Sequence, residues 1–143
     1  MNRCVLDASV AAKWYLPADA EPLAREALAL LLSYTKGQTE VLVPDLFYAE
    51  VGNILWKAER QGRCSPELGN AAVSALVQAG FRNFASATLL ASALSIARAH
   101  GRTVYDSLYL VLAVQESATM ITADERLANA VAAYLPVKWL GAV

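Results

Sequence analysis

The chain has 143 residues, which is the length of one compact domain with a buried core, so we expect a single domain over residues 1–143. The residues Ala, Val, Ile, Leu, Met, Phe, Trp, Tyr and Cys make up 57% of the chain and charged residues 17%, which is more apolar than an average soluble domain. The formal net charge of -1 argues against a protein that holds nucleic acid through bulk positive charge, so any contact with a polyanion has to be local or mediated by a metal ion.

The sequence contains no segment that predicts membrane insertion or export. No apolar run reaches the roughly 18 residues of a membrane-spanning helix. The apolar patch in "MNRCVLDASV" is too short for the core of a signal peptide. Cys4 and Cys64 lack metal-ligand spacing and are expected to be reduced packing residues. We therefore expect a cytoplasmic protein.

Apolar runs and helix breakers predict the elements of the first half of the chain. In chain order they indicate a buried strand at residues 3–7, a helix at 8–16 that Pro17 ends, a helix at 20–33, a buried strand at 40–44 and a long helix from Asp45 to about residue 61. Asp45 is expected to cap this long helix, and Gly62 follows it as a stop signal.

The second half of the chain continues the alternation of helices and strands. Ser65 and Pro66 open a helix that ends near residue 80, by the pattern of an N-cap followed by proline. The stretch "FRNFAS" gives no clear strand. Next come helices at 88–100 and 105–113, a buried strand at 119–122, a helix at 124–134 and a short strand at 137–140. This pattern predicts an α/β fold, a three-layer α/β/α domain around a short, mostly parallel sheet of four to five strands.

Four acidic residues lie where the surrounding sequence is apolar. Asp7 follows "CVL", Asp124 follows "MITA", and Asp106 precedes "SLYLVL". Parallel sheets bind ligands at the carboxyl ends of their strands, where Asp7 and Asp124 stand. Each aspartate also begins a helix, so helix capping is an alternative interpretation for any one of them. Glu50 lies on the flank of the apolar stripe of its helix, and no cation stands four residues away to explain it as a surface ion pair.

These acids predict a cation site if they converge. Two carboxylates about 5 Å apart repel by roughly 3 kcal/mol at an effective dielectric of about 20. Oxygen ligands favour Mg²⁺ or Mn²⁺. Other chemistries lack their required parts, because the chain has no HExxH, CxxC, GxGxxG or P-loop motif. Its one histidine, His100, stands at a helix end before Gly101, so a Ser-His-Asp triad is unsupported.

Four blocks of the sequence resemble the PIN domain, and specifically the VapC-type toxins of toxin-antitoxin pairs. They are "VLDASV", "PDLFYAEVGN", "GRTVYDSLYLVLA" and "MITADERL", in the family's order and across nearly the whole chain. The resemblance implies a metal-dependent endoribonuclease that leaves a 5′-phosphate and a 3′-hydroxyl. Its acidic pocket is formed by Asp7, Glu50, Asp106 and Asp124. The three aspartates hold one or two Mg²⁺ or Mn²⁺ ions, and Glu50 orients the attacking water or completes the ion's ligands.

The resemblance also covers three polar residues that support the acids. Ser9 matches the hydroxyl residue of the family's Asp-x-Ser opening, Asn53 the Asn of its Glu-x-x-Asn helix, and Thr122 its Thr-x-Asp element. Each has an ordinary explanation as well: a first-turn helix residue, a surface polar group and a strand residue, respectively.

An RNA substrate, a VapB-like antitoxin and a homodimer are the partners that the resemblance implies. Lys57, Arg60 and Arg63 recur every three residues and form a candidate track for RNA phosphates, although we prefer to explain them by the dipole of a helix end. Further candidates for RNA contact are Lys13, Arg82 and Arg102. Bulky residues that either anchor a partner or pack in the core are Trp14, Tyr15, Leu16, Phe47 and Trp56.

Several alternative functions stay open. A PIN nuclease that processes RNA outside a toxin pair fits the same residues. An Asp-nucleophile phosphatase of the haloacid dehalogenase type needs a second Asp two residues after Asp7, where Ser9 stands, and a receiver domain needs an acidic pair at this strand end. A non-enzymatic interaction domain is disfavoured because all four acids are present.

Overall fold

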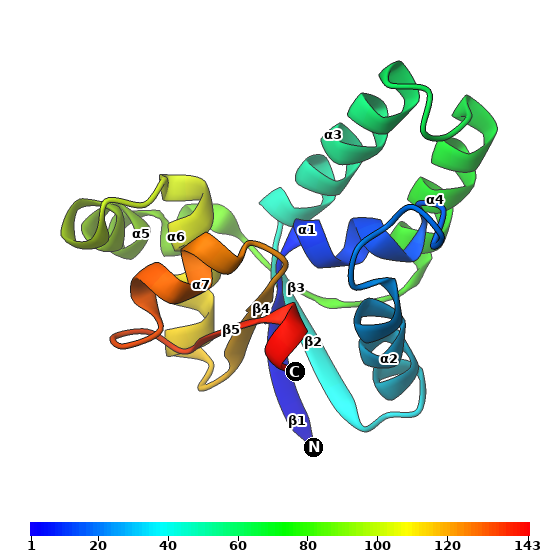
Figure 1. The fold of residues 1–143 in the computed structure, drawn as a ribbon. Coiled ribbons are helices and arrows are strands. Elements are labelled where there is room, and N and C mark those ends of the chain that lie inside the picture. Colours follow the sequence, from blue (N-terminus) through cyan, green and yellow to red (C-terminus); the bar gives the residue numbers. More distant parts are fainter.

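A five-stranded parallel sheet forms the centre of the computed structural model, which describes residues 1–143 (Figure 1). The strands are β1 (Asn2–Leu6), β2 (Thr39–Pro44), β3 (Arg82–Phe84), β4 (Thr119–Thr122) and β5 (Val137–Trp139). Their order across the sheet is β3-β2-β1-β4-β5, and every neighbouring pair is parallel. The three central strands are buried on both faces, which explains their continuous apolar runs.

The helices lie on the two sides of this sheet. Those of the first half are α1 (Ala8–Ala11), the 3-10 helix η1 (Ala12–Trp14), α2 (Ala24–Thr35), α3 (Leu46–Arg60) and α4 (Pro66–Gln78). Those of the second half are α5 (Ser86–His100), α6 (Val104–Gln115), α7 (Glu125–Val131) and the 3-10 helix η2 (Leu140–Ala142). Figure 1 places α1 to α4 on one side of the strands and α5 to α7 on the other. The predicted three-layer α/β/α fold is therefore confirmed.

The direction of the chain across the sheet reverses between β1 and β4. From β1 the chain steps outward to β2 and β3, then crosses to the other side of β1, where β4 and β5 follow. β1 and β4 are hydrogen-bonded neighbours, with Cys4 opposite Thr119 and Leu6 opposite Ile121. Ligands of open α/β sheets bind outside the carboxyl ends of the strands at such a reversal.

The fifth strand is the main difference from the sequence prediction. The segment Arg82–Phe84 pairs with Leu42–Pro44 as edge strand β3, although no clear strand is predicted there. It has only three residues, and Arg82 and Asn83 are exposed, so it shows neither an apolar run nor an alternating pattern.

Two helix starts also differ from the prediction, while a third is confirmed. The helix expected from residue 20 begins at Ala24, after Leu23 adopts a left-handed conformation with φ of 60°. Asp45 does not cap α3, because its carboxylate instead accepts hydrogen bonds from the backbone N–H and the hydroxyl of Ser86 at the start of α5. Ser65 caps α4 as predicted, since its hydroxyl accepts the N–H of Leu68 at 3.1 Å.

Helix α6 is the most deeply packed helix. All residues from Ser107 to Ala113 are buried, against α5 on one side and against β1, β2 and β4 on the other. No helix in the structure is both long enough and apolar enough to span a bilayer.

Candidate functional site

Asp7 stands directly after β1, at the point where β1 and β4 lie side by side. Its backbone N–H donates to the carbonyl of Ile121 in β4 at 3.0 Å. Its Oδ2 accepts hydrogen bonds from the hydroxyls of Thr122 (2.7 Å) and Ser9 (2.8 Å). Asp7 does not cap α1, so the capping interpretation is wrong here. The carboxylate is instead oriented by hydroxyls from both sides of the strand junction.

Ser9 and Thr122 connect the two strand ends beyond Asp7. The Ser9 hydroxyl also accepts the N–H of Ala123 at 3.1 Å, and the Thr122 hydroxyl accepts the N–H of Asp124 at 3.0 Å. Thr122 is fully buried. Each hydroxyl therefore donates a hydrogen bond to Asp7 and accepts one from a backbone N–H of the connection between β4 and α7. Their positions in a first helical turn and in a strand do not by themselves account for these bonds.

Glu50, on α3, is held by a residue that the sequence analysis did not single out. The hydroxyl of Tyr109, on α6, donates to its Oε1 at 2.6 Å. The Tyr109 side chain is 1% exposed, and the backbone of Ala8 and the charge of Asp7 act on the same hydroxyl. A buried tyrosine hydroxyl requires a hydrogen-bond partner, and Tyr109 lies three residues after Asp106 on the same helix face. These two facts together are the signal in the sequence that Tyr109 belongs to the site.

Asp106 and Asp124 reach the site from the starts of α6 and α7. Thr103, not Asp106, caps α6, because its hydroxyl accepts the N–H of Asp106 at 3.0 Å. The Asp106 carboxylate therefore does not serve as the cap of α6. Asp124 does cap α7, with its Oδ1 accepting the N–H of Leu127 at 3.1 Å. The capping interpretation thus holds for Asp124 alone among the three aspartates.

Electrostatic coupling ties the acids together. Burial raises the pKa of Asp7, against the lowering effect of the Thr122 and Ser9 hydroxyls. Burial also raises the pKa of Glu50, the Tyr109 hydrogen bond lowers it, and the charges of Asp7 and Asp106 raise it further. The pKa of Asp106 is raised by burial and by the charges of Asp7 and Asp124, in opposition to its hydrogen bond with Thr103 and to Arg102. The Glu50 and Asp106 carboxylates are therefore costly to ionise beside the other acids, and the Asp7 carboxylate is costly to ionise because it is buried.

A hollow of about 430 Å³ is lined by Asp7 and Glu50 but not by Asp106 or Asp124. Its residues are Asp7, Ala8 and Ser9, then Leu46, Ala49, Glu50, Asn53, Ile54 and Lys57 of α3, and Tyr105 of α6. Asn53 is exposed on its wall. No three carboxylate, imidazole or thiol side chains form a ready metal cluster in these rotamers. The donor set nevertheless fits Mg²⁺ or Mn²⁺, because it consists of oxygens whose mutual repulsion a divalent cation would relieve.

The comparison with known proteins identifies the fold family. A model of the PIN domain matches residues 4–132. The chain belongs to the PIN-domain family. This PIN domain is 30% identical over 129 residues to Ribonuclease VapC3 of Pyrobaculum aerophilum, with 89% of this chain and 93% of that protein covered.

Solved structures share the fold of this PIN domain at low sequence identity. PAE2754 of Pyrobaculum aerophilum superposes with a TM-score of 0.73 at 19% identity, covering 99% of this chain and 91% of that one. VapC20 of Mycobacterium tuberculosis, a toxin that cleaves the sarcin-ricin loop, gives 0.65 at 14% identity and covers 92% and 95% of the two chains. A toxin-antitoxin complex from Klebsiella pneumoniae gives 0.60 at 13% identity, with 94% and 95% covered.

The three cations that are candidates for a phosphate track have different surroundings in the PIN domain. Lys57 lines the hollow. Arg60 stacks over the ring of Trp56 at 5.3 Å, and Arg63 pairs with Glu21 at 3.9 Å. Contact of these residues with RNA stays a prediction, and Lys57 is the one best placed for it.

The other candidate cations have partners within the protein or lie beside the acids. Lys13 pairs with Glu21 at 3.0 Å, and Arg82 pairs with Glu40 at 3.3 Å. The charge of Arg102 lowers the pKa of Asp106, and the buried Nε of Arg102 has no hydrogen-bond partner.

The bulky residues predicted as partner anchors or core divide between the two roles. Leu16 and Phe47 are buried in the core. Trp14 is fixed by a 2.8 Å hydrogen bond from its Nε1 to the carbonyl of Ala27, and its ring packs edge-on to Tyr15. Trp56 is 51% exposed and is the one that stays available at the surface.

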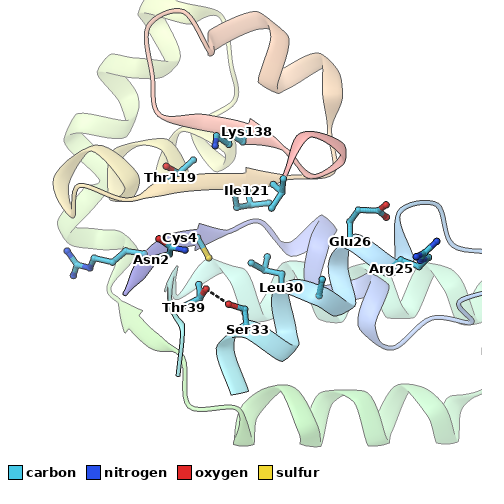
Figure 2. Close-up of a pocket in the computed structure, with 13 residues that line it drawn as sticks. Asn2, Cys4, Arg25, Glu26, Leu30, Ser33, Thr39, Thr119, Ile121 and Lys138 are labelled. Carbon is cyan, nitrogen blue, oxygen red and sulfur yellow. Dashed lines mark hydrogen bonds between the residues drawn. The ribbon is translucent and has the colours of Figure 1, made fainter. Parts of the chain in front are cut away.

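A second hollow of the PIN domain, of about 770 Å³, lies apart from the acids (Figure 2). Asn2, Thr39 and Thr119, which begin three of the strands, mark its place at the amino end of the sheet. Figure 2 shows Leu30 and Ser33 of α2 pointing toward the strands there, with Ser33 hydrogen-bonded to Thr39 at 2.6 Å. None of the four candidate acids lines it.

Proposed function

We propose that this PIN domain is a metal-dependent endoribonuclease and the toxin of a toxin-antitoxin pair. The observation that carries the proposal is the cluster at the junction of β1 and β4, where the charges of Asp7 and Asp106 raise the pKa of Glu50 and those of Asp7 and Asp124 raise the pKa of Asp106. The relationship to Ribonuclease VapC3 over most of both chains supports the choice of RNA as substrate.

The side chains divide the work of the reaction. Asp7, Asp106 and Asp124 are the residues that would hold one or two Mg²⁺ or Mn²⁺ ions, with Glu50 beside them. When bound, such an ion lowers the pKa of the attacking water and offsets the charge of the phosphodiester. Ser9 and Thr122 keep Asp7 aimed at this position through their 2.8 and 2.7 Å hydrogen bonds. Glu50, fixed by Tyr109, orients the attacking water for in-line displacement at phosphorus.

A direct test uses purified protein and single-stranded RNA. Cleavage is expected in the presence of Mg²⁺ or Mn²⁺, and EDTA abolishes it. Asp7→Asn and Asp106→Asn are expected to lose activity while circular dichroism shows that the fold persists. Asp19→Asn, at an exposed aspartate outside the cluster, is the matched control and keeps its activity. Cleavage without a metal ion, or full activity in both cluster variants, would refute the mechanism.

A VapB-like antitoxin is the proposed protein partner, and the solved toxin-antitoxin complex from Klebsiella pneumoniae with the same fold supports it. We also propose a cytoplasmic homodimer in which residues 1–143 form one PIN domain. Purification from the native host is expected to recover a small protein bound to the chain, and light scattering gives the number of copies. A partner-free nuclease in the host would favour the alternative, a PIN nuclease that acts in RNA processing.

A further inference from the structure

Tyr105 is a large aromatic residue left exposed at the mouth of the acidic hollow. It directly precedes Asp106 on α6 and is 59% exposed, whereas Ser107 to Ala113 of the same helix are buried. The two other tyrosines with hydrogen-bonded hydroxyls use them inside the protein, Tyr34 to the carbonyl of Ala79 and Tyr109 to Glu50. Tyr105 takes part in none of the protein's side-chain hydrogen bonds or aromatic pairs, so packing does not explain its presence.

The other residues that line the hollow offer both apolar and cationic contacts. Leu46, Ala49 and Ile54 of α3 supply apolar surface in the same hollow, and Lys57 stands at its end. Lys57 forms none of the protein's ion pairs. The hollow of about 430 Å³ falls within the size range of small-ligand sites, which is enough space for one nucleotide.

We infer that Tyr105 stacks on an unpaired base of the RNA next to the cleaved phosphodiester, while Lys57 contacts a neighbouring phosphate. The inference rests on the proposed ribonuclease function and adds a base contact to its site. Bases inside a duplex already stack on their neighbours, so a protein ring gains contact only with a base that is free of them. Tyr105 is therefore assigned to a base that is unpaired beside the cleaved bond.

Binding of RNA to the Asp7→Asn protein tests this assignment without cleavage. The probe is a fluorescein-labelled, random-sequence, 20-nucleotide single-stranded RNA in the presence of Mg²⁺, and the measurement is its anisotropy. Loss of one base-stacking ring by Tyr105→Ala is expected to weaken binding about 10-fold or more. Tyr105→Phe keeps the ring and recovers the binding. Tyr134→Ala removes a tyrosine that is 75% exposed away from the hollow and is the matched control.

A second probe separates stacking from a loss of local structure. An RNA of the same length without bases presents the backbone alone, so Tyr105→Ala is expected to leave its dissociation constant unchanged. An equal loss of affinity for the abasic and the normal RNA would assign Tyr105 to the structure of α6 and overturn the inference. Unchanged affinity for normal RNA in Tyr105→Ala overturns it as well, while cleavage by the wild-type protein would still uphold the nuclease. A wild-type protein that neither binds nor cuts RNA refutes both.

Discussion

Replacing Tyr109 by phenylalanine removes one hydroxyl between α6 and α3 and leaves the buried ring in place. The hydroxyl donates to Glu50 at 2.6 Å, and no other side chain donates to that carboxylate. A hydrogen bond to a charged group contributes about 1.5 to 3 kcal/mol, and the half-buried position of Glu50 lets water replace part of it. We expect Tyr109→Phe to lower the free energy of unfolding by about 1 to 2 kcal/mol at pH 7. For a chain of this length that lowers Tm by roughly 3 to 7 °C.

The pH dependence distinguishes this hydrogen bond from ordinary packing. The pKa of Glu50 in the folded protein is raised above its unfolded value, so the stability linked to this group is fully present below the unfolded pKa and is lost as pH rises through the folded pKa. The Tyr109 hydrogen bond lowers the folded pKa, and its loss raises that pKa further. The destabilisation by Tyr109→Phe is therefore larger at pH 7, where Glu50 is ionised, than at pH 4.

Urea denaturation of the metal-free protein at both pH values measures the effect. Tyr34→Phe is the matched control, because the Tyr34 hydroxyl donates to the backbone carbonyl of Ala79, which does not titrate. The control is expected to lose the same stability at pH 4 and pH 7. Equal destabilisation of Tyr109→Phe at the two pH values would refute the reasoning. Cleavage assays on the same variant are expected to show a lower kcat with little change in KM, since Glu50 loses its orientation and not its contact with RNA.

Three further predictions concern the same cluster. Thr122→Val removes the 2.7 Å hydrogen bond to Asp7 and the acceptor for the N–H of Asp124. Calorimetry is expected to show that the free energy of unfolding falls by about 1 to 3 kcal/mol, and cleavage is expected to slow. Unchanged stability and rate would contradict the role of this hydroxyl. Without metal, Asp7→Asn is expected to raise Tm, because the raised pKa shows that the charged form is costly in the folded protein. Mn²⁺ at about 100 times its Kd is expected to stabilise the wild type by about 2.7 kcal/mol and the variant much less, and equal stabilisation of both would exclude Asp7 as a ligand. Lys57→Ala is expected to weaken RNA binding and to lower its salt dependence by about one counterion. Arg63→Ala is expected to have a smaller effect, because Arg63 already pairs with Glu21. Titrations at several salt concentrations make the comparison, and equal effects of the two variants would support RNA contact by the whole three-residue track.

The acids at strand ends could be located from the sequence because they depend on local rules. A buried strand followed by a helix places the next residue at the carboxyl edge of the sheet, which located Asp7 and Asp124. Tyr109 was not predicted, since a buried tyrosine hydroxyl indicates that a partner is needed but not that the partner is Glu50 of α3. Edge strand β3 was not predicted either, because its pairing with β2 uses backbone groups that leave no side-chain pattern.

Side-chain partners from distant parts of the chain account for the other differences. Asp45 has the position of a helix cap, but its carboxylate accepts hydrogen bonds from the N–H and the hydroxyl of Ser86, 41 residues away. Arg63 has the spacing of a phosphate track, but Glu21 lies beside it in the folded protein. Helix periodicity describes neighbours along one element and carries no information about residues that approach from another.

The pairing of β1 with β4 also sets the order in which the molecule is completed during synthesis. The hydrogen bond between Asp7 and Thr122 joins residues 115 positions apart, and every strand between them in the sequence lies elsewhere in the sheet. A growing chain can pair β1 with β2 early, but it cannot assemble the acidic cluster until Asp124 has been added. A ribosome-bound fragment that ends before β4 would thus contain Asp7 and Glu50 but lack Thr122 and Asp124. The geometry of the sheet therefore delays completion of the proposed site until translation of the domain is nearly finished.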